Sequence, residues 1–190
     1  MNKIHSLTLA CALLASFAPR PAPGHMTPPV VLATDREAVS RLLSGASRYF
    51  VREVRLSASQ QDAIRQKTAW TPDEDYYRFY VGRTADGVAL GAVMFLSEFT
   101  IHGPVRVAAA IGPDGRIRGA SVVEVTEESY SWVKPLLDAG FLRRFSGRDA
   151  RGALGAAVDV GGSMPRFYAD VIARLIARAA ALYDVALSRT

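Results

Sequence analysis

The feature that most constrains the fold of this 190-residue chain is a series of β-prone segments, joined by very short turns, between residues 76 and 125. Ala85-Asp-Gly87 and Pro113-Asp-Gly115 are typical hairpin turns, and His102-Gly-Pro104 interrupts the apolar run between them. Connections this short join antiparallel neighbours, because parallel strands need a long crossover. The pattern therefore predicts an antiparallel meander with strands over residues 76–82, 88–100, 105–111 and 117–125.

Helical patterns lie on both sides of this meander. Thr34-Asp-Arg-Glu37 is a capping box and predicts a helix over 35–44. A strand over 49–56 and a short helix capped by Ser57 or Ser59 follow, and helical spacing returns over 135–145 and 165–187. We expect an α+β fold in which a mainly antiparallel twisted sheet packs against the long C-terminal helix and the shorter helices. The apolar face of that last helix contains Phe167, Val171, Leu175, Ala179 and Leu182.

The N-terminus has the sequence of a secretory signal. The positive residue Lys3 precedes an apolar run, Leu7–Ala18, and a Pro-rich stretch follows. We predict a signal peptide over residues 1–24 with cleavage between Ala22 and Ala33, an unstructured leader over 19–33 and a single domain over 34–190. The protein is then expected in the periplasm or outside the cell. The apolar run is too short for a permanent anchor, so no stable membrane span is expected once the signal is removed.

Composition excludes several classes of function. The only cysteine, Cys11, lies inside the signal, so the mature chain has no thiol for a disulfide, an iron–sulfur cluster or a nucleophile. The formal charge is +5, and loss of Lys3 and Arg20 leaves +3, because no acidic residue precedes Asp35. A charge this low does not indicate nucleic-acid binding, which usually requires a concentrated basic patch.

A glycine-rich loop, Asp159-Val-Gly-Gly-Ser-Met-Pro165, leads into the last predicted helix. Gly161 and Gly162 allow a ligand to approach the backbone closely, and the unpaired N–H groups at a helix start favour a phosphate. Pro165 suits the first helical position, where its missing N–H costs nothing. The alternative is an ordinary helix entry with Ser163 as its cap.

Other polar and aromatic residues are weaker candidates. Residues 122–130 are predicted as the end of a strand followed by an acidic loop, which either presents ligand contacts or is a solvated turn. His102 has no partner at metal-ligand spacing, and no Ser-His-Asp set is visible. Five aromatic side chains could stack on a flat ligand or belong to the core: Trp70, Tyr76, Tyr77, Tyr130 and Trp132.

The order of these pieces resembles the FMN-binding domain family of bacterial extracytoplasmic electron-transfer systems. Residues 111–125 are similar to the family's strand, D-G-[KR]-[IV] turn and following strand, which ends near a glutamate, here Glu127. Phe141-Leu-Arg-Arg-Phe-Ser-Gly147 is similar to its F-x-x-Q-F-x-G segment. Residues 159–171 lie where the family has D-x-x-[ST]-G-A-T-x-[ST]-S and a helix. The resemblance covers residues 88–187.

In that family, the final threonine of G-A-T carries FMN through a phosphoester bond that a flavin transferase forms outside the cytoplasm. This chain lacks that threonine. If Asp159 and Val171 keep the family register, the acceptor position is Pro165, which has no hydroxyl; if the glycines are aligned instead, Ser163 is the acceptor. The resemblance implies FMN that is bound covalently through Ser163, bound non-covalently, or absent. The cofactor site that it implies consists of Glu127, Asp159, Gly161, Gly162 and Ser163.

Two functions follow from the resemblance. The first is an extracytoplasmic FMN-binding electron-transfer domain protein, whose partner is another redox protein or a membrane electron-transfer complex. The second is a domain of the same fold without cofactor that acts as a periplasmic ligand-binding or assembly partner. Because no catalytic set of residues is visible, both are favoured over an unrelated exported enzyme.

Overall fold

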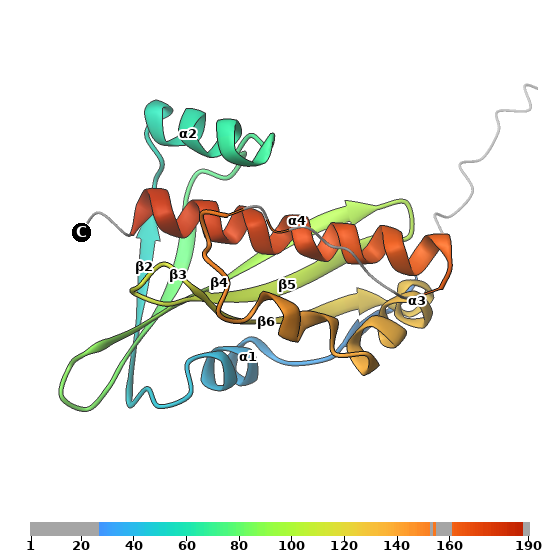
Figure 1. Cartoon of the computed structure of the whole chain (residues 1–190), viewed down its shortest axis with the longest axis horizontal. Helices are drawn as coiled ribbons and strands as arrows, with labels where there is room; N and C mark the ends of the chain where they lie inside the picture. Colours follow the sequence, from blue (N-terminus) through green and yellow to red (C-terminus); the bar gives the residue numbers. More distant parts are fainter. Residues whose placement is uncertain (1–26, 153, 155–160, 188–190) are drawn as a thin grey trace, which may run out of the picture.

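The computed structural model describes residues 27–152, 154 and 161–187, and these form a six-stranded antiparallel sheet with helices on both faces (Figure 1). The strand order is β1-β6-β5-β4-β3-β2, so β2 to β6 form a meander. This confirms the predicted meander and the α+β class. The strands are β1 (Pro29–Val31), β2 (Arg48–Val54), β3 (Tyr77–Arg83), β4 (Ala89–Thr100), β5 (Gly103–Ile111) and β6 (Ile117–Thr126). The helices are α1 (Asp35–Leu42), α2 (Ala58–Thr68), α3 (Glu127–Asp138), the short 3-10 helix η1 (Phe141–Phe145) and α4 (Ser163–Ala186).

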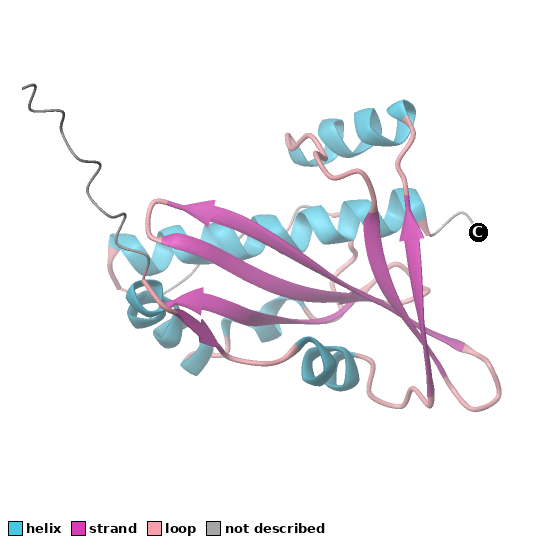
Figure 2. Cartoon of the chain, turned by 180° about the vertical axis from the view of Figure 1, so that it is seen from behind, coloured by secondary structure: helices cyan, strands magenta, loops and turns pink. Residues whose placement is uncertain are grey.

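Helix α4 lies along one face of the sheet, with α2 and α3 packed against it, and α1 covers the opposite face (Figures 1 and 2). Val171, Leu175 and Leu182 of the predicted apolar face are buried in the main core, whereas Phe167 at its N-terminal end is 39% exposed. Complete burial of an aliphatic side chain is worth about 1.5–3 kcal/mol. The α4 face is therefore a main source of stability for the domain.

The central strand β5 is buried on both faces, because successive side chains of a strand point in opposite directions. Val107 and Ala109 belong to the main core beneath α4, and Ala108 and Ala110 belong to a smaller core beneath α1. Small residues on the second face allow α1 to lie close to the sheet.

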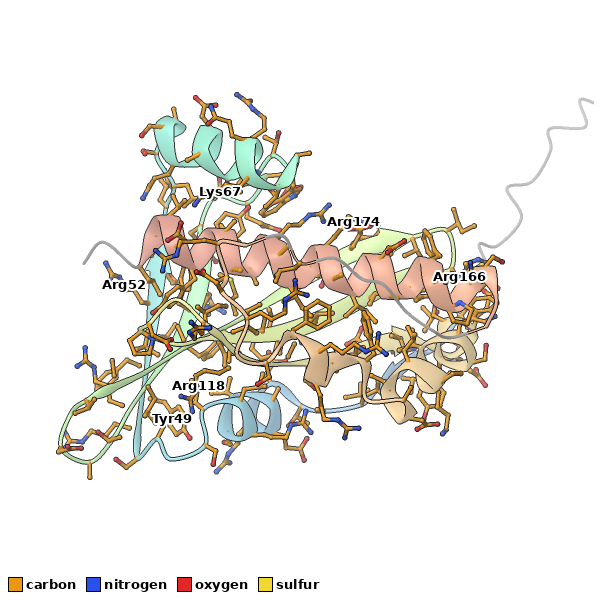
Figure 3. The ribbon with its side chains drawn as sticks, viewed as in Figure 1. Tyr49, Arg52, Lys67, Arg118, Arg166 and Arg174 are labelled. Carbon is orange, nitrogen blue, oxygen red and sulfur yellow. The ribbon has the colours of Figure 1, made fainter. Side chains whose placement is uncertain are left out.

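Charged residues hold α4 in register with its neighbours. Arg174 and Arg178 each donate to one oxygen of Glu98 on β4, at 2.7 and 2.8 Å, and Lys67 on α2 pairs with Asp184. Figure 3 labels Arg174 and Lys67. Such partly exposed pairs each contribute up to about 1 kcal/mol, so they orient the helix more than they stabilise it.

Both predicted helix caps near the N-terminus are present. The Thr34 side chain accepts from the backbone N–H of Glu37 at 3.3 Å, and the Glu37 carboxylate accepts from the backbone N–H of Thr34 at 2.8 Å. These bonds to Thr34 lower the pKa of Glu37. Ser57 and Gln60 form the same arrangement at the start of α2. Local polar sequence therefore determines where both helices begin.

The expected unstructured leader over 19–33 is wrong for its last residues, because β1 pairs with the free edge of β6. Val30 lies opposite Val125, Leu32 donates to the carbonyl of Val123 at 2.8 Å, and Ala33 is buried. The edge of β6 offers unpaired backbone groups and an apolar surface, and both are satisfied by this short apolar segment. Residues 29–33 therefore belong to the domain. The predicted signal peptide lies outside the described residues.

The acidic loop expected after β6 is also wrong, because α3 starts directly at Glu127. Thr126 is the N-cap, and its side chain accepts from the backbone N–H of Ser129 at 3.2 Å. Two glutamates then occupy the first turn, where negative charge favours the helix. Pro135, the predicted start of a helix over 135–145, lies inside α3. Residues 141–145 of that predicted helix form the separate η1.

Replacement of Ile172, which is fully buried on α4, tests whether this helix dominates the stability of the domain. We expect Ile172→Ala to lower the free energy of unfolding by about 2–5 kcal/mol, because it removes buried surface and leaves a cavity. Arg174→Ala on the same helix removes only a surface ion pair and should cost about 1 kcal/mol or less. Urea unfolding of both variants measures the difference, and equal losses would contradict this account.

Candidate functional site

The start of α4 is the best-defined candidate site. Gly162, at the N-cap position, has φ of 103°, a conformation that favours glycine, and no side chain in the described part of the chain caps the helix. Gly161, Gly162 and Ser163 are all exposed. The first N–H groups of a helix lack intrahelical partners and carry the positive end of its dipole. This end of α4 therefore offers free donors to solvent or to an anion.

The structure of this helix start differs from the sequence-based prediction in two details. The helix begins at Ser163, two residues before the predicted start, so Pro165 is its third residue. Proline is still tolerated there, because the N–H groups of the first turn have no intrahelical acceptor. Ser163 is then the first helical residue, and it is not the side-chain cap that the alternative interpretation expected. Asp159 lies outside the described residues.

Helix α3 lies at the same end of the molecule as the start of α4 (Figures 1 and 2), and a buried group of hydroxyls connects the two helices. The hydroxyls of Ser129 on α3 and Tyr168 on α4 share a hydrogen bond of 2.7 Å, and both residues are fully buried. Thr126 donates to the carbonyl of His102 at 2.6 Å and lies 2.9 Å from the Ser129 hydroxyl. The starts of α3 and α4 are thereby held together, with Glu127 exposed at the first position of α3.

A row of aromatic rings continues from this hydroxyl group to the surface. Phe167 packs edge-on against Tyr168 at 5.2 Å between ring centroids, and Tyr168 stacks on Trp132 at 5.8 Å with an interplanar angle of 16°. Trp132 also contacts the His102 ring at 4.8 Å. The His102 ring is held on its other side by Glu128, whose carboxylate lies 2.8 Å from Nδ1. We call Phe167, Tyr168, Trp132 and His102 the aromatic row.

Ser163 and Phe167 lie four residues apart on α4 and therefore share one face of the helix. Both are exposed, Phe167 by 39%. A flat ligand with a phosphate at the uncapped helix start can thus reach the open end of the aromatic row. The described residues bring together four of the five predicted cofactor residues, namely Glu127, Gly161, Gly162 and Ser163, at this end of the molecule.

The turn between β4 and β5 projects at this same end and is strongly apolar. Phe99 is 83% and Ile101 92% exposed. Exposed apolar side chains that occur together in this way often mark a surface that binds another molecule. We call Phe99 and Ile101 the apolar tip.

The predicted aromatic set is divided between two places. Tyr130 and Trp132 lie on α3. The other three, Trp70, Tyr76 and Tyr77, line a hollow of about 560 Å³ where β3 and β4 diverge (Figure 2). The two strands pair only between Tyr80–Val93 and Arg83–Ala89, so β4 from residue 94 onward pairs with β5 alone.

The arginines in this hollow are matched by carboxylates within the protein. Arg106 donates to both carboxylate oxygens of Asp35, at 2.5 and 2.9 Å, and this bond lowers the pKa of Asp35. Arg178 lies over the Trp70 ring at 5.3 Å while it binds Glu98. The hollow therefore offers little unpaired positive charge to an anionic ligand.

The described residues contain neither a metal-binding cluster nor a membrane-spanning helix. No group of three or more His, Cys, Asp or Glu side chains in that part of the chain is arranged to hold a metal ion. None of its helices is long and apolar enough to cross a membrane. Neither the models of known protein families nor the curated proteins compared with this chain gave a match.

Sequence reasoning missed the partners of His102 and Tyr168. His102 pairs with Glu128 and Tyr168 with Ser129, across 26 and 39 residues. Contacts over such separations leave no periodic pattern in the sequence. The one local signal was Thr126-Glu-Glu-Ser129, whose hydroxyl spacing is typical of a helix cap.

Tyr168→Phe tests whether the hydroxyl group joins the two helix starts. Loss of a buried hydrogen bond should lower the free energy of unfolding by about 1 kcal/mol and increase amide hydrogen exchange in the first turn of α3. Tyr76→Phe is a matched control, because Tyr76 is 50% exposed and makes no hydrogen bond with its hydroxyl among the described residues. If exchange in α3 is unchanged in Tyr168→Phe, the proposed connection between α3 and α4 is wrong.

Proposed function

We propose that this chain is an extracytoplasmic FMN-binding domain protein that carries electrons between partner proteins. The observation that supports the proposal best is the exposed, uncapped start of α4 at Gly161–Ser163, next to the open end of the aromatic row. The start of a helix is a favourable place for a phosphate, and exposed rings are favourable for a flat heterocycle. The resemblance of residues 88–187 to the family adds to this physical argument.

The residues present fit a phosphate at the helix start. No atom of the described residues beyond its chain neighbours lies within 4 Å of the position that a Cβ would occupy at Gly161, so these residues leave the backbone open to a ligand there. The backbone N–H groups of the first turn and the Ser163 hydroxyl would bind the phosphate. Phe167, at the open end of the aromatic row, would lie beside the ring system, and Glu127 would lie at its rim. Bound FMN would supply the redox chemistry, and the protein would bind and orient it.

The mode of attachment depends on Ser163. Its exposed position on the first turn makes its hydroxyl accessible to a flavin transferase. Pro165, which stands at the acceptor position in the other register, has no hydroxyl. Covalent attachment therefore requires Ser163, whereas non-covalent binding requires only the backbone donors and the aromatic row.

Export is part of the same proposal. The signal-like residues 1–24 would direct the protein to the periplasm or the outside of the cell, where covalent flavin is installed in the family. The partner would be a redox protein or a membrane electron-transfer complex.

A second candidate function is a cofactor-free domain that serves as a ligand-binding or assembly partner. The exposure of the apolar tip, 83% for Phe99 and 92% for Ile101, favours this candidate, because such residues are suited to a protein contact whether or not flavin is bound. The missing threonine of the family motif favours it as well.

A visible absorption spectrum separates these candidates. The protein is exported from a host that has a flavin transferase, and the spectrum is recorded before and after acid precipitation. The proposal predicts flavin absorbance in the purified protein. Covalent FMN stays in the pellet and is lost in Ser163→Ala but not in the matched control Ser40→Ala, an exposed serine on α1. Non-covalent FMN moves to the supernatant. A colourless protein that also fails to bind added FMN would overturn the proposal and leave the cofactor-free candidate.

A further inference from the structure

We propose a second binding site, for a small molecule that carries a phosphate group, on the α1 face of the sheet. A hollow of about 690 Å³ lies between the C-terminal half of α1, the start of β4, the β5–β6 turn and the end of η1. Three arginines line it from separate elements: Arg41 on α1, Arg116 in the turn and Arg118 on β6. We call it the basic hollow. It goes beyond the proposed FMN function and does not depend on it.

The basic hollow lies far from the α4 start along the sheet. Strand β5 runs from Gly103, beside the apolar tip, to Ile111, and the turn that lines the hollow follows at its other end. Figure 3 shows Arg118 on the side of the sheet that α1 covers. The two sites therefore share no residue and are separated by the length of β5.

The positive charge of the hollow is only partly offset within the described part of the chain. Glu37 and Asp149 lie near enough to Arg41 and Arg116 that these arginines, after the carboxyls' own hydrogen bonds, lower the pKa of each carboxyl. None of Arg41, Arg116 and Arg118 forms a salt bridge with a described carboxylate. Asp114 is the one carboxylate in the lining, and its Oδ1 accepts from the backbone N–H of Arg116 at 3.1 Å, which holds the turn. Three guanidinium groups against one carboxylate leave a net charge of +2. This contrasts with the hollow between β3 and β4, where each lining arginine is paired with a carboxylate.

Two of the arginines are held in place while they keep free donors. Arg41 donates to the Ser121 hydroxyl at 2.6 Å, and Arg116 donates to the carbonyl of Gly147 at 2.7 Å. A guanidinium has five N–H donors, so each retains several for a ligand. The guanidinium of Arg118 has no partner among the described residues, although its backbone carbonyl accepts from Ser146 at 2.9 Å. Because the side chains of Arg41 and Arg116 are already held in place, they lose little conformational entropy when an anion binds.

The lining also indicates what else the ligand carries. Leu42 and Leu90 give the basic hollow an apolar part next to the arginines. Guanidinium groups bind phosphate through parallel hydrogen bonds, and their planar shape matches its oxygens. The ligand class is therefore a phosphate ester with an apolar body, either a soluble small molecule or a phospholipid headgroup with part of its chain.

An NMR titration tests the proposal with phenyl phosphate as the probe and inorganic phosphate and phenol as comparisons. We expect saturable shifts in the amides of Gly112 and Ile117 and in the side-chain Nε–H signals of the three arginines. Phenyl phosphate should bind more tightly than inorganic phosphate, because only the ester reaches the apolar part, and phenol should cause no such shifts. Vesicles that contain phosphatidylglycerol form a second arm, since arginine-dependent binding to them alone would assign the phosphate to a lipid.

Arg118→Gln is the decisive variant, because the guanidinium that it removes bonds to no described residue and the fold should be unaffected. It should weaken binding by about tenfold, the effect of one lost charge-assisted hydrogen bond. Arg36→Gln is the matched control: it makes the same change of charge on α1 outside the hollow, and it should alter the affinity less than twofold. Equal weakening by both variants, or shifts that do not saturate or that lie elsewhere, would overturn the proposal.

Discussion

The packing of α4 against the sheet is the interaction on which the rest of the structure depends. Its buried side provides much of the main core, and residues of β4, β5, α2 and α3 all contact it. A helix of 24 residues placed along the sheet also fixes where its own first turn lies. The position of Gly161–Ser163 is thus a consequence of apolar burial along the helix.

The polar contacts of α4 refine this placement at both ends. Near its start, the Tyr168 hydroxyl is bonded to Ser129, so the first turn of α3 and the second turn of α4 are held together. Farther along, Glu98 holds two arginines and prevents the helix from rotating over β4. Buried hydroxyl networks contribute little net stability but strongly favour one arrangement, because any other leaves a buried donor unpaired.

Much of the fold could be predicted from sequence because its signals are local. The hairpin turns at Ala85–Gly87 and Pro113–Gly115 and the caps at Thr34 and Ser57 each depend on a few neighbouring residues. Strand β1 could not be predicted, because a three-residue segment that begins with Pro29 forms a strand only where β6 offers a free edge. The aromatic row and the basic hollow unite residues that are distant in sequence, so their members could be named one by one but not placed together.

Mapping FMN on the mature protein by NMR tests the central claim most directly, namely that the start of α4 is the ligand site. The account predicts that added FMN shifts the amides of Gly161, Gly162 and Ser163 most strongly, together with the indole N–H of Trp132. The amide signals of Ile101 and Glu127, at the same end of the molecule, should shift less, and the amide signals of α2 should not shift. Shifts that are absent, or that are confined to Gly112 and Arg118 in the basic hollow, would contradict it.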